Sequence, residues 1–317
     1  MTTRWVIGRG LLGRAVIGAA DTLPVSVPVR WIDPEAAVAD LTTGLDTLAD
    51  SLADARDGTW QVFWCAGRGV TSSPRDQLET EVEVFRRFLA LLAEHPRLDA
   101  SHGSLFVASS VGGVYGGCPH PPFSETTPPQ PVSAYGEAKL QMEALARATS
   151  EATGLRSFVG RITNLYGPAQ DLSKGQGLIS VIVASYLTGR PATIYVSLDT
   201  LRDYLFADDC GRMVLAGLDR LAGEPAGTSV VKILGSMTPW SIGAILGEAS
   251  RIHRLRAPIV SAQGPTGRLA GQADDLRVRS EVWTELDGLA RTTLPEGLDA
   301  LHRAQLADVM AHGAPAR

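Results

Sequence analysis

Tyr135 and Lys139 are the two residues whose types and spacing first suggest acid–base chemistry. They lie four positions apart in the segment AYGEAK. On a helix this spacing places both side chains on one face, so that the Lys139 ammonium lies beside the Tyr135 phenol. A neighbouring cation stabilises the phenolate, which favours tyrosine as a general base toward an alcohol or a ketone. The same spacing is also common on a solvated helix face, so the surrounding elements must decide.

A hydroxyl that would complete such a site precedes the pair. Residues 109–116 read SSVGGVYG and follow the apolar run Ser104–Ala108. That run predicts a buried strand, which delivers Ser109 and Ser110 to its carboxyl end. We expect one of the two hydroxyls to hydrogen-bond the substrate oxygen whose proton Tyr135 removes or returns.

The N-terminus predicts a site for a dinucleotide. A short apolar strand, Arg4–Ile7, leads into a glycine-rich turn and then into a helix that begins near Arg14. Glycines permit a tight turn and close backbone approach, and the helix N-terminus offers free N–H groups and a positive dipole to a pyrophosphate. The predicted cofactor contacts in this turn are Gly8, Arg9, Gly10, Leu11, Leu12 and Gly13.

The adenosine end of this site is expected to be abbreviated. Val25–Val29 can form a second strand, yet a helical pattern begins soon after Asp33. An acid that ends the second strand would bind the ribose hydroxyls of NAD, whereas arginine favours the phosphate of NADP. Asp33 is a candidate for that acid. Alternatively, Asp33 belongs to a third strand and Arg9, Arg14 and Arg30 surround the ribose, so the preference between NAD and NADP stays open.

The following segments predict a parallel sheet covered by helices. Trp60–Gly67 is an apolar run that ends in small residues, as a central strand does, and its last residues Cys65, Ala66 and Gly67 are expected at the cofactor. Apolar residues recur at helical spacing from Leu78 to Leu92. The alternation of strands and helices predicts an α/β fold with a doubly wound parallel sheet.

Composition excludes several classes of function. The 317 residues are 44% hydrophobic and carry a net charge of −5. Because the arginines are scattered, there is no basic footprint for nucleic acid or an anionic membrane. No apolar run is long enough to span a bilayer, and the cytoplasm is the expected location. The three cysteines, Cys65, Cys118 and Cys210, are far apart, which favours reduced thiols and no metal site.

Five motifs in fixed order resemble a known family. They are the glycine turn, the Ser-Ser run before Val-Tyr-Gly, the Tyr-x-x-x-Lys pair, RITNLYGP at 161–168 and RDYLFADD at 202–209. Together they resemble the extended short-chain dehydrogenase/reductases, and within them the nucleotide-sugar epimerase/dehydratase group. The resemblance covers residues ~4 to ~235 well.

The resemblance implies roles and an architecture. Tyr135 is the base, Lys139 binds the nicotinamide ribose and tunes the phenol, and a serine completes the set. Residues 1–165 form a Rossmann domain, to which 201–234 return, and 166–317 form a substrate lobe. A homodimer is implied as well. Four residues are expected to hold the pyrophosphate and sugar of the substrate, namely Asn164, Arg202, Tyr204 and Lys174.

Departures from the family pattern narrow the reaction. Many relatives place the hydroxyl four residues before the tyrosine of Val-Tyr-Gly, where this chain has Val111, and Ser110 is therefore favoured over Ser109. Sugar 4,6-dehydratases carry an Asp-Glu pair where this chain has Gly112 and Gly113, so dehydration is disfavoured. Relatives similar to GDP-fucose synthase use a cysteine and a histidine that this chain lacks at the matching positions. C4 epimerisation is expected first and C4-keto reduction second, and a dinucleotide-binding regulator without turnover is the alternative of another class.

Overall fold

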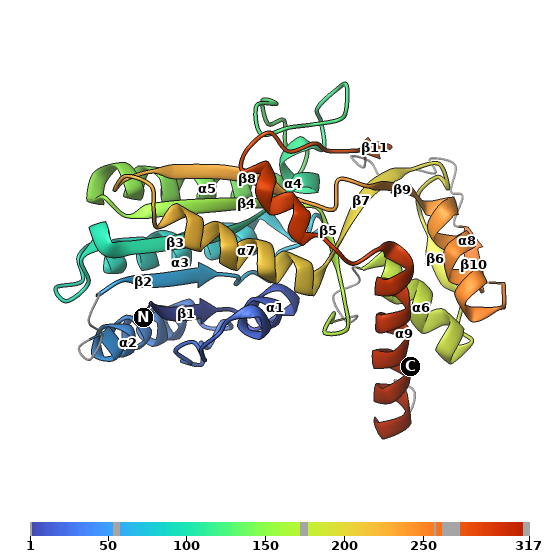
Figure 1. Cartoon of the computed structure of the whole chain (residues 1–317), viewed down its shortest axis with the longest axis horizontal. Helices are drawn as coiled ribbons and strands as arrows, with labels where there is room; N and C mark the ends of the chain where they lie inside the picture. The colour runs from blue at the N-terminus through green and yellow to red at the C-terminus, as the bar shows by residue number, and fades with distance from the viewer. Residues whose placement is uncertain (1, 53–57, 172–176, 257, 262–272, 313–317) are drawn as a thin grey trace.

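A five-stranded parallel sheet forms the centre of the larger part of the molecule in the computed structural model, which describes residues 2–52, 58–171, 177–256, 258–261 and 273–312. The strand order is β1 (Thr3–Ile7), β2 (Trp60–Trp64), β3 (Gly103–Ser110), β4 (Arg156–Ile162) and β8 (Ser229–Leu234). The predicted doubly wound α/β fold is confirmed (Figure 1). No helix in these ranges is both long and apolar enough to cross a membrane.

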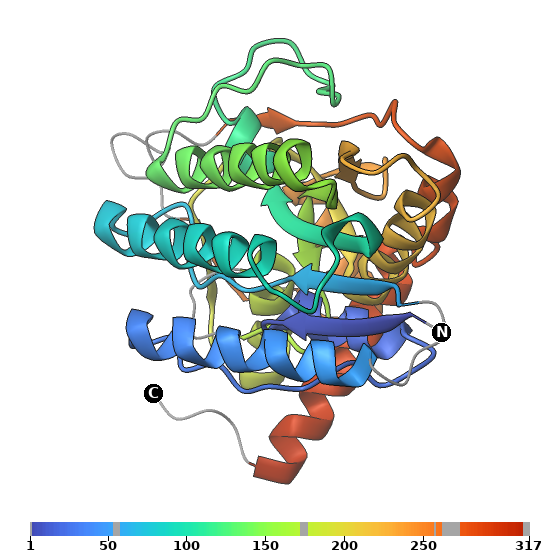
Figure 2. The same cartoon turned by 90° about the vertical axis from the view of Figure 1, so that its left-hand side faces the viewer.

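Helices cover both faces of this sheet. On one face lie α2 (Pro34–Leu52), α3 (Arg75–Ala93) and α5 (Ala134–Thr153), which run side by side in Figure 2. The other face is covered by α1 (Leu11–Ala19) and α7 (Ala207–Leu221). Two short helices precede and follow β3, namely η1 (Ala100–His102) and α4 (Val111–Tyr115).

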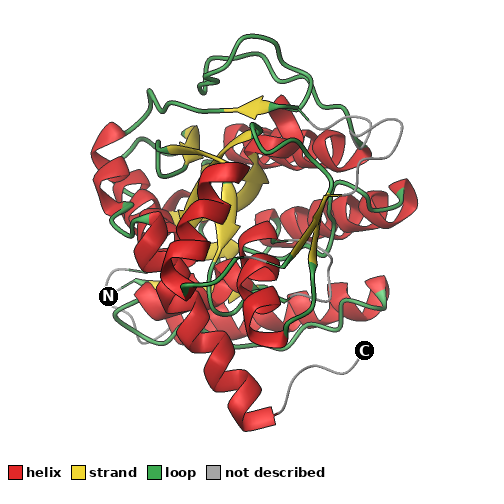
Figure 3. Ribbon diagram, turned by 90° about the vertical axis from the view of Figure 1, so that its right-hand side faces the viewer, coloured by secondary structure: helices red, strands yellow, loops and turns green. Residues whose placement is uncertain are grey.

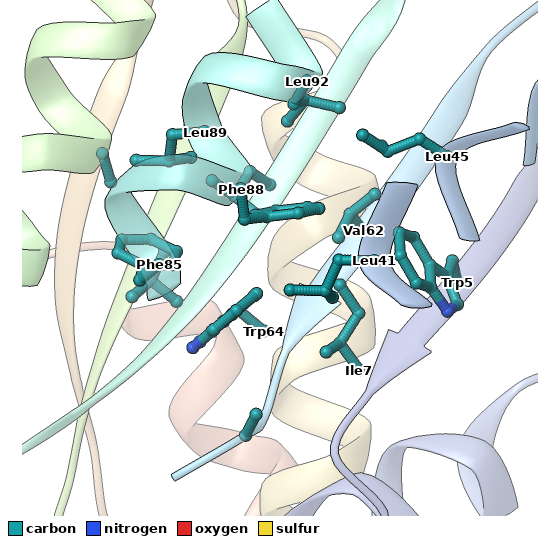
Figure 4. Close-up of a cluster of buried hydrophobic side chains, with 14 of the residues drawn as sticks. Trp5, Ile7, Leu41, Leu45, Val62, Trp64, Phe85, Phe88, Leu89 and Leu92 are labelled. Carbon is teal, nitrogen blue, oxygen red and sulfur yellow. The ribbon is translucent and has the colours of Figure 1, made fainter. Parts of the chain in front are cut away.

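The first face holds an aromatic core. Trp64 packs against Phe85 and Phe88 at ring-centroid distances of 4.8 and 5.0 Å, and Trp5 meets Phe88 edge-on. Figure 4 shows these rings between the sheet and the helices, with Leu41 and Leu45 closing the cluster from α2. Such rings bury large apolar areas, so the strand ends that carry the site rest on a rigid layer.

The second strand that the sequence predicts is absent. Within Val25–Val29, only Val25 pairs with Trp5 of β1, and it does so as an isolated bridge. Pro24 comes directly before this segment and Pro28 lies within it. Proline lacks the N–H that a ladder needs, so the segment does not extend into a strand. β1 is therefore the edge strand of the sheet, with β2 on its other side, and the expected abbreviation of the adenosine end goes further than the sequence suggested.

A smaller lobe packs at the carboxyl edge of the sheet, on the side that faces the viewer in Figure 3. Its helices are α6 (Leu178–Thr188), α8 (Ile242–His253) and α9 (Leu294–His312), and α9 extends away from the body in Figure 1. Its strands are β5 (Asn164–Tyr166), β6 (Ala192–Ile194), β7 (Leu201–Phe206), β9 (Pro239–Ser241), β10 (Ile259–Ser261) and β11 (Asp275–Leu276).

Part of the C-terminal third returns to the large sheet. The side chain of Lys232 on β8, fully buried, donates to Ser280 Oγ, Val282 O and Asp287 Oδ1, each at 2.7 Å. The helix η3 (Thr284–Leu289) then packs on α7. These residues fall within the range 166–317 that the family resemblance assigns to the lobe, yet they contact β8, the edge strand of the five-stranded sheet.

Candidate active site

The helix that carries Tyr135 and Lys139, α5, is held against the turn that follows β3. Ser133 caps α5, accepting from the Gly136 N–H at 3.2 Å, and Gly154 ends the helix in the left-handed conformation. A Cβ on Gly136 would lie 2.0 Å from Gly113 O, and a Cβ on Gly113 would lie 3.0 Å from Tyr135 Cε1. Glycine at both positions therefore lets α5 and the Tyr135 ring contact the turn directly.

Lys139 lies beside Tyr135, as the spacing predicts. Its Nζ is 5.6 Å from the centroid of the Tyr135 ring and donates to Ala108 O at 3.1 Å. Lys139 is 8% exposed, whereas Tyr135 is half-buried. The bond to β3 anchors the ammonium at the carboxyl end of the sheet, so the pair does not lie on a solvated helix face.

The hydroxyls of Ser109 and Ser110 have different hydrogen-bond partners. Ser109 is buried and donates to Glu143 Oε1 at 2.5 Å. Ser110 Oγ accepts from the Gly113 N–H at 3.2 Å as the N-cap of α4. Its own hydrogen has no acceptor within the described part of the chain. Val111, at the position where relatives carry the hydroxyl, is 2% exposed and packs with Val114 and Leu276.

A buried ion pair supports this turn, and the sequence reasoning missed it. Arg161 on β4 donates to both oxygens of Glu143 on α5, at 3.1 and 2.7 Å, and also to Tyr115 at 2.6 Å. Burial acts to lower the pKa of Arg161, but the hydrogen bonds that Arg161 donates to Glu143 and the charge of Glu143 keep this pKa raised. Two signals were available: Glu143 follows Lys139 by four residues, and Arg161 is a charge within an apolar strand.

The glycine turn fits a dinucleotide pyrophosphate. Gly8 has φ +90°, and a Cβ there would lie 2.5 Å from Ala66 N. A Cβ on Gly13 would lie 1.8 Å from Gly8 O, so that glycine lets α1 pack on the turn. Gly10, which precedes α1, has nothing within 4 Å of its Cβ position, and the first turn of α1 carries no acid. The open space therefore faces free N–H groups and a positive helix end.

Other predicted cofactor residues flank this turn. Leu11 and Leu12 open α1. Cys65 continues from β2 and donates its N–H to Ile7 O at 2.9 Å, next to Ala66 and Gly67. Burial raises the pKa of the Cys65 thiol, against the charge of Lys139, so that it stays neutral.

The expectation that Asp33 ends a strand is wrong. Asp33 precedes α2, and its Oδ1 accepts from the N–H groups of Glu35 and Ala36 at 3.0 and 3.3 Å, as in a helix N-cap. Arg30 forms a bidentate pair with Asp40. Because Pro24 and Pro28 lack the N–H that a strand ladder needs, the chain passes the sheet edge without forming the strand that would have positioned an acid.

Arg9, unlike Arg30, has a hydroxyl and not a carboxylate as its described partner. Its guanidinium donates to Ser26 Oγ at 2.5 Å, and Ser26 follows the single β-bridge residue Val25. Neither Arg9 nor Arg14 pairs with a carboxylate within the described ranges.

The predicted substrate residues come from adjacent strands of the lobe. Asn164, paired with Tyr204 in register, is exposed and donates Nδ2 to Asp203 O at 2.9 Å. Tyr204 is 9% exposed, and burial raises its pKa to about 12. Arg202 is 8% exposed and donates to Leu201 O and Ala273 O. Lys174 lies outside the described residues.

Arg202 also connects to the catalytic turn. It pairs in register with Leu276 of β11, and a Cβ on Gly112 would lie 3.8 Å from Leu276 Cδ1. Burial lowers the pKa of Arg202, although guanidinium remains charged. The charges of Asp274 and Asp275 act on this cation, and its described hydrogen-bond acceptors are the carbonyls of Leu201 and Ala273.

No group of three or more histidine, cysteine, aspartate or glutamate side chains in the described ranges is arranged to hold a metal ion.

The fold and site define a Rossmann-type protein with a tyrosine–lysine pair at the carboxyl edge of its sheet, beside a glycine turn. The NAD dependent epimerase/dehydratase family model matches residues 8–231. The chain belongs to this family, and its resemblance to the extended short-chain dehydrogenase/reductases is confirmed.

Individual relatives match over part of their length. The chain is 33% identical over 141 residues to dTDP-glucose 4,6-dehydratase of Salmonella typhimurium, which covers 41% of this chain and 37% of the relative. It is 33% identical over 160 residues to UDP-glucose 4-epimerase of Mycolicibacterium smegmatis, covering 50% and 48%. The matches therefore span less than half of these relatives.

Solved structures agree over nearly the whole fold. MoeE5 in complex with UDP-glucuronic acid and NAD superposes with a TM-score of 0.76, at 22% identity, over 96% of this chain and 99% of that one. RMD from Pseudomonas aeruginosa complexed with NADPH gives a TM-score of 0.74, at 23% identity, over 98% and 100%. At these identities the likeness concerns the fold.

Proposed function

We propose that this protein is a nucleotide-sugar epimerase that inverts C4 of the sugar through its transient oxidation, with NAD or NADP as cofactor. The observation that carries the proposal is the Tyr135–Lys139 pair, anchored on Ala108 O and facing the same strand edge as the glycine turn. When bound, the dinucleotide supplies the two-electron oxidation and its reversal.

The residues of the chain supply proton transfer and orientation. Tyr135 takes the proton of the C4 hydroxyl and later returns it. Lys139 stabilises the phenolate and binds the ribose hydroxyls. Ser110, whose hydrogen has no described acceptor, hydrogen-bonds the reacting oxygen. Ser109 contributes only indirectly, because its hydroxyl is bonded to Glu143.

The turn before Tyr115 argues against dehydration. An acid at position 113 would place its Cβ 3.0 Å from Tyr135 Cε1, closer than side chains normally approach. Gly112 and Gly113 also carry no group that could donate or accept a proton during elimination. The chemistry that remains requires one proton shuttle and the redox cofactor.

The substrate is proposed to be a nucleoside diphosphate sugar. Arg202 supplies a buried positive charge for the diphosphate. Tyr204 lies on the same strand, β7, and Asn164 is its partner on β5. Lys174 remains a predicted contact. The homodimer and the cytoplasmic location likewise remain predictions.

A 4-ketoreductase is the second candidate, and Arg9 favours it. Arg9 donates to Ser26, which belongs to the segment where the predicted second strand would have carried a carboxylate to the ribose of NAD. An arginine and a hydroxyl suit the 2′-phosphate of NADPH, the dinucleotide that a one-way reduction consumes.

The experiment starts from the purified full chain. Any nucleotide released on denaturation is identified, and the native protein is incubated with pairs of nucleotide sugars that differ at C4. We expect interconversion of one pair without added cofactor; stoichiometric consumption of NADPH with a 4-keto sugar would select the reductase. If no nucleotide sugar were bound or altered, the substrate class would be wrong.

Tyr135→Phe tests the assigned base. It removes one oxygen and is expected to lower kcat by at least about 100-fold, because general acid–base catalysis contributes 10²–10⁴-fold. Binding of the dinucleotide, measured by calorimetry, should persist. Tyr195→Phe, at a tyrosine 54% exposed, is the matched control and should retain full activity. Full activity of Tyr135→Phe would refute the role of Tyr135.

A further inference from the structure

The loop that follows β2 begins at the cofactor turn. Cys65 N–H donates to Ile7 O at 2.9 Å, and the Cβ position of Gly8 is 2.5 Å from Ala66 N. The start of this loop therefore contacts the backbone that would approach the pyrophosphate.

The next residues of the same loop lie against the catalytic pair. A Cβ on Gly67 would lie 3.8 Å from Lys139 Nζ, and a Cβ on Gly69 would lie 3.6 Å from Tyr135 Cδ2. Gly67 has φ +150°, which favours glycine. Residues 66–69 thus extend from the glycine turn to Tyr135 and Lys139. The nicotinamide half of a bound dinucleotide would lie between these two places.

A carboxylate on α3 holds this stretch. Oε1 of Glu81 accepts the N–H of Arg68 at 2.8 Å and the N–H of Gly69 at 2.9 Å. These two donors have no other acceptor in the described part of the chain. Hydrogen bonds to an ionised acceptor are roughly twice as strong as neutral ones, so Glu81 is a firm anchor for a loop of small residues.

The second oxygen of Glu81 lies on the side of the catalytic pair. Oε2 is 3.6 Å from the Cβ position of Gly67 and 3.2 Å from that of Gly69, the same two points that lie beside Lys139 and Tyr135. No hydrogen bond from the described ranges reaches this oxygen. The carboxylate therefore borders the site instead of serving only a surface loop.

We infer that Glu81 is a positioning residue of this site: it holds residues 67–69 against Tyr135 and Lys139 and so forms the wall on which the nicotinamide ribose is seated. The inference rests on the dinucleotide cofactor of the proposed function, but not on the identity of the sugar or on the choice between epimerase and reductase.

The test compares two variants with a control on the same helix. Glu81→Ala removes the acceptor, and Glu81→Gln keeps one oxygen for both N–H groups without the charge. Glu79→Ala, at an exposed neighbouring position, is the control. Dissociation constants of the full chain are measured by calorimetry for NADH, NADPH and ADP, because ADP lacks the nicotinamide and its ribose.

The expected pattern separates positioning from general stability. Loss of two charge-assisted bonds should weaken the better dinucleotide about 10-fold or more in Glu81→Ala and leave ADP within about twofold. Glu81→Gln should stay within about threefold of the unmodified protein, and Glu79→Ala should be unchanged. In the unmodified protein, amide exchange at Arg68 and Gly69 should slow further with dinucleotide but not with ADP, which tests the inference even if Glu81→Ala does not fold.

Three results would overturn the inference: unchanged dinucleotide binding in Glu81→Ala, an equal loss of ADP and dinucleotide, or Glu81→Gln binding as weakly as Glu81→Ala at an unchanged melting temperature. In each case the proposed function would stand. If the unmodified protein bound neither dinucleotide, the cofactor of the proposed function would fail as well.

Discussion

At the scale of single residues, Arg9 is the predicted contact for the adenosine end of a dinucleotide. It donates to Ser26, and Asp33 is engaged in capping α2. An acid would repel a 2′-phosphate, whereas a guanidinium and a hydroxyl would bind it. Under the proposed function, the charge beside the missing strand would set the preference between NAD and NADP, which the sequence left open because the strand could not be located.

The prediction that follows is a preference for NADPH over NADH in binding. Arg9→Gln should weaken NADPH about 10-fold, the cost of a charge-assisted hydrogen bond, and leave NADH nearly unchanged. Calorimetric titration measures both. Arg190→Gln makes the same charge change at an exposed position in the lobe and should affect neither. Equal losses for the two dinucleotides would contradict the assigned role of Arg9.

Gly113 governs how closely the Tyr135 ring approaches the turn. In Gly113→Ala the new Cβ would lie 3.0 Å from Cε1 and 3.2 Å from Cδ1, so the ring must move by a few tenths of an ångström. Because small misplacements of a catalytic group are costly, we expect kcat to fall about 10-fold at an unchanged melting temperature. Gly112→Ala meets only Leu276, at 3.8 Å, and should keep its rate. Similar rates for both variants would show that this contact does not matter.

At the scale of elements, the lobe is held by a junction of α6, α8 and α9. His253 stacks on Tyr186 at 4.0 Å and meets His302 edge-on at 4.5 Å. Burial, followed by the charge of His302, lowers the pKa of His253 from its usual 6.5. Its buried Nε2 has no hydrogen-bond partner in the described part of the chain. The unfolded chain therefore binds a proton at a higher pH than the folded one.

Acidification should consequently destabilise the lobe. Stability is complete above the unfolded pKa, near 6.5, and falls as the pH decreases from there toward the folded pKa. His253→Phe keeps the stacking and removes the titration, so its loss of melting temperature between pH 7.5 and 5.0 should be smaller. His102→Gln, at an exposed histidine, is the control. An identical pH dependence in His253→Phe would refute the role of His253.

At the scale of the whole molecule, residues 280–287, which follow the lobe strand β11, contact the edge strand β8 of the five-stranded sheet. Lys232 holds Ser280, Val282 and Asp287 from a fully buried position. Lys232→Met keeps the apolar stem but removes the partner charge of Asp287, whereas Ser280 and Val282 remain hydrogen-bonded to each other. The loss should lower the free energy of unfolding by about 3 kcal/mol in urea titrations. Arg220→Gln breaks exposed ion pairs with Glu285 and Glu224 and the contact with the Trp283 ring, and should cost less, about 1 kcal/mol. Equal costs would mean that burial of Lys232 adds nothing.

Local patterns were enough to predict the elements that carry the chemistry. The strand–glycine turn–helix at the N-terminus, the helix over Leu78–Leu92, the strand before Ser109 and the face shared by Tyr135 and Lys139 all follow from periodicity and spacing, which depend on near neighbours in the chain. The resemblance of five ordered motifs added the family.

Contacts between residues far apart in the sequence required the tertiary structure. Ser109 is bonded to Glu143 only because β3, β4 and α5 meet there, and Glu81 reaches the loop after β2 from the next helix. The Val25–Val29 strand failed because prolines deny the ladder its donors, although its apolar residues suggested a strand. The sequence by itself determined the fold class and the juxtaposition of Tyr135 and Lys139, since local periodicity encodes them. The structure decided what each neighbouring polar group is bonded to, because hydrogen bonds between distant segments exist only after folding.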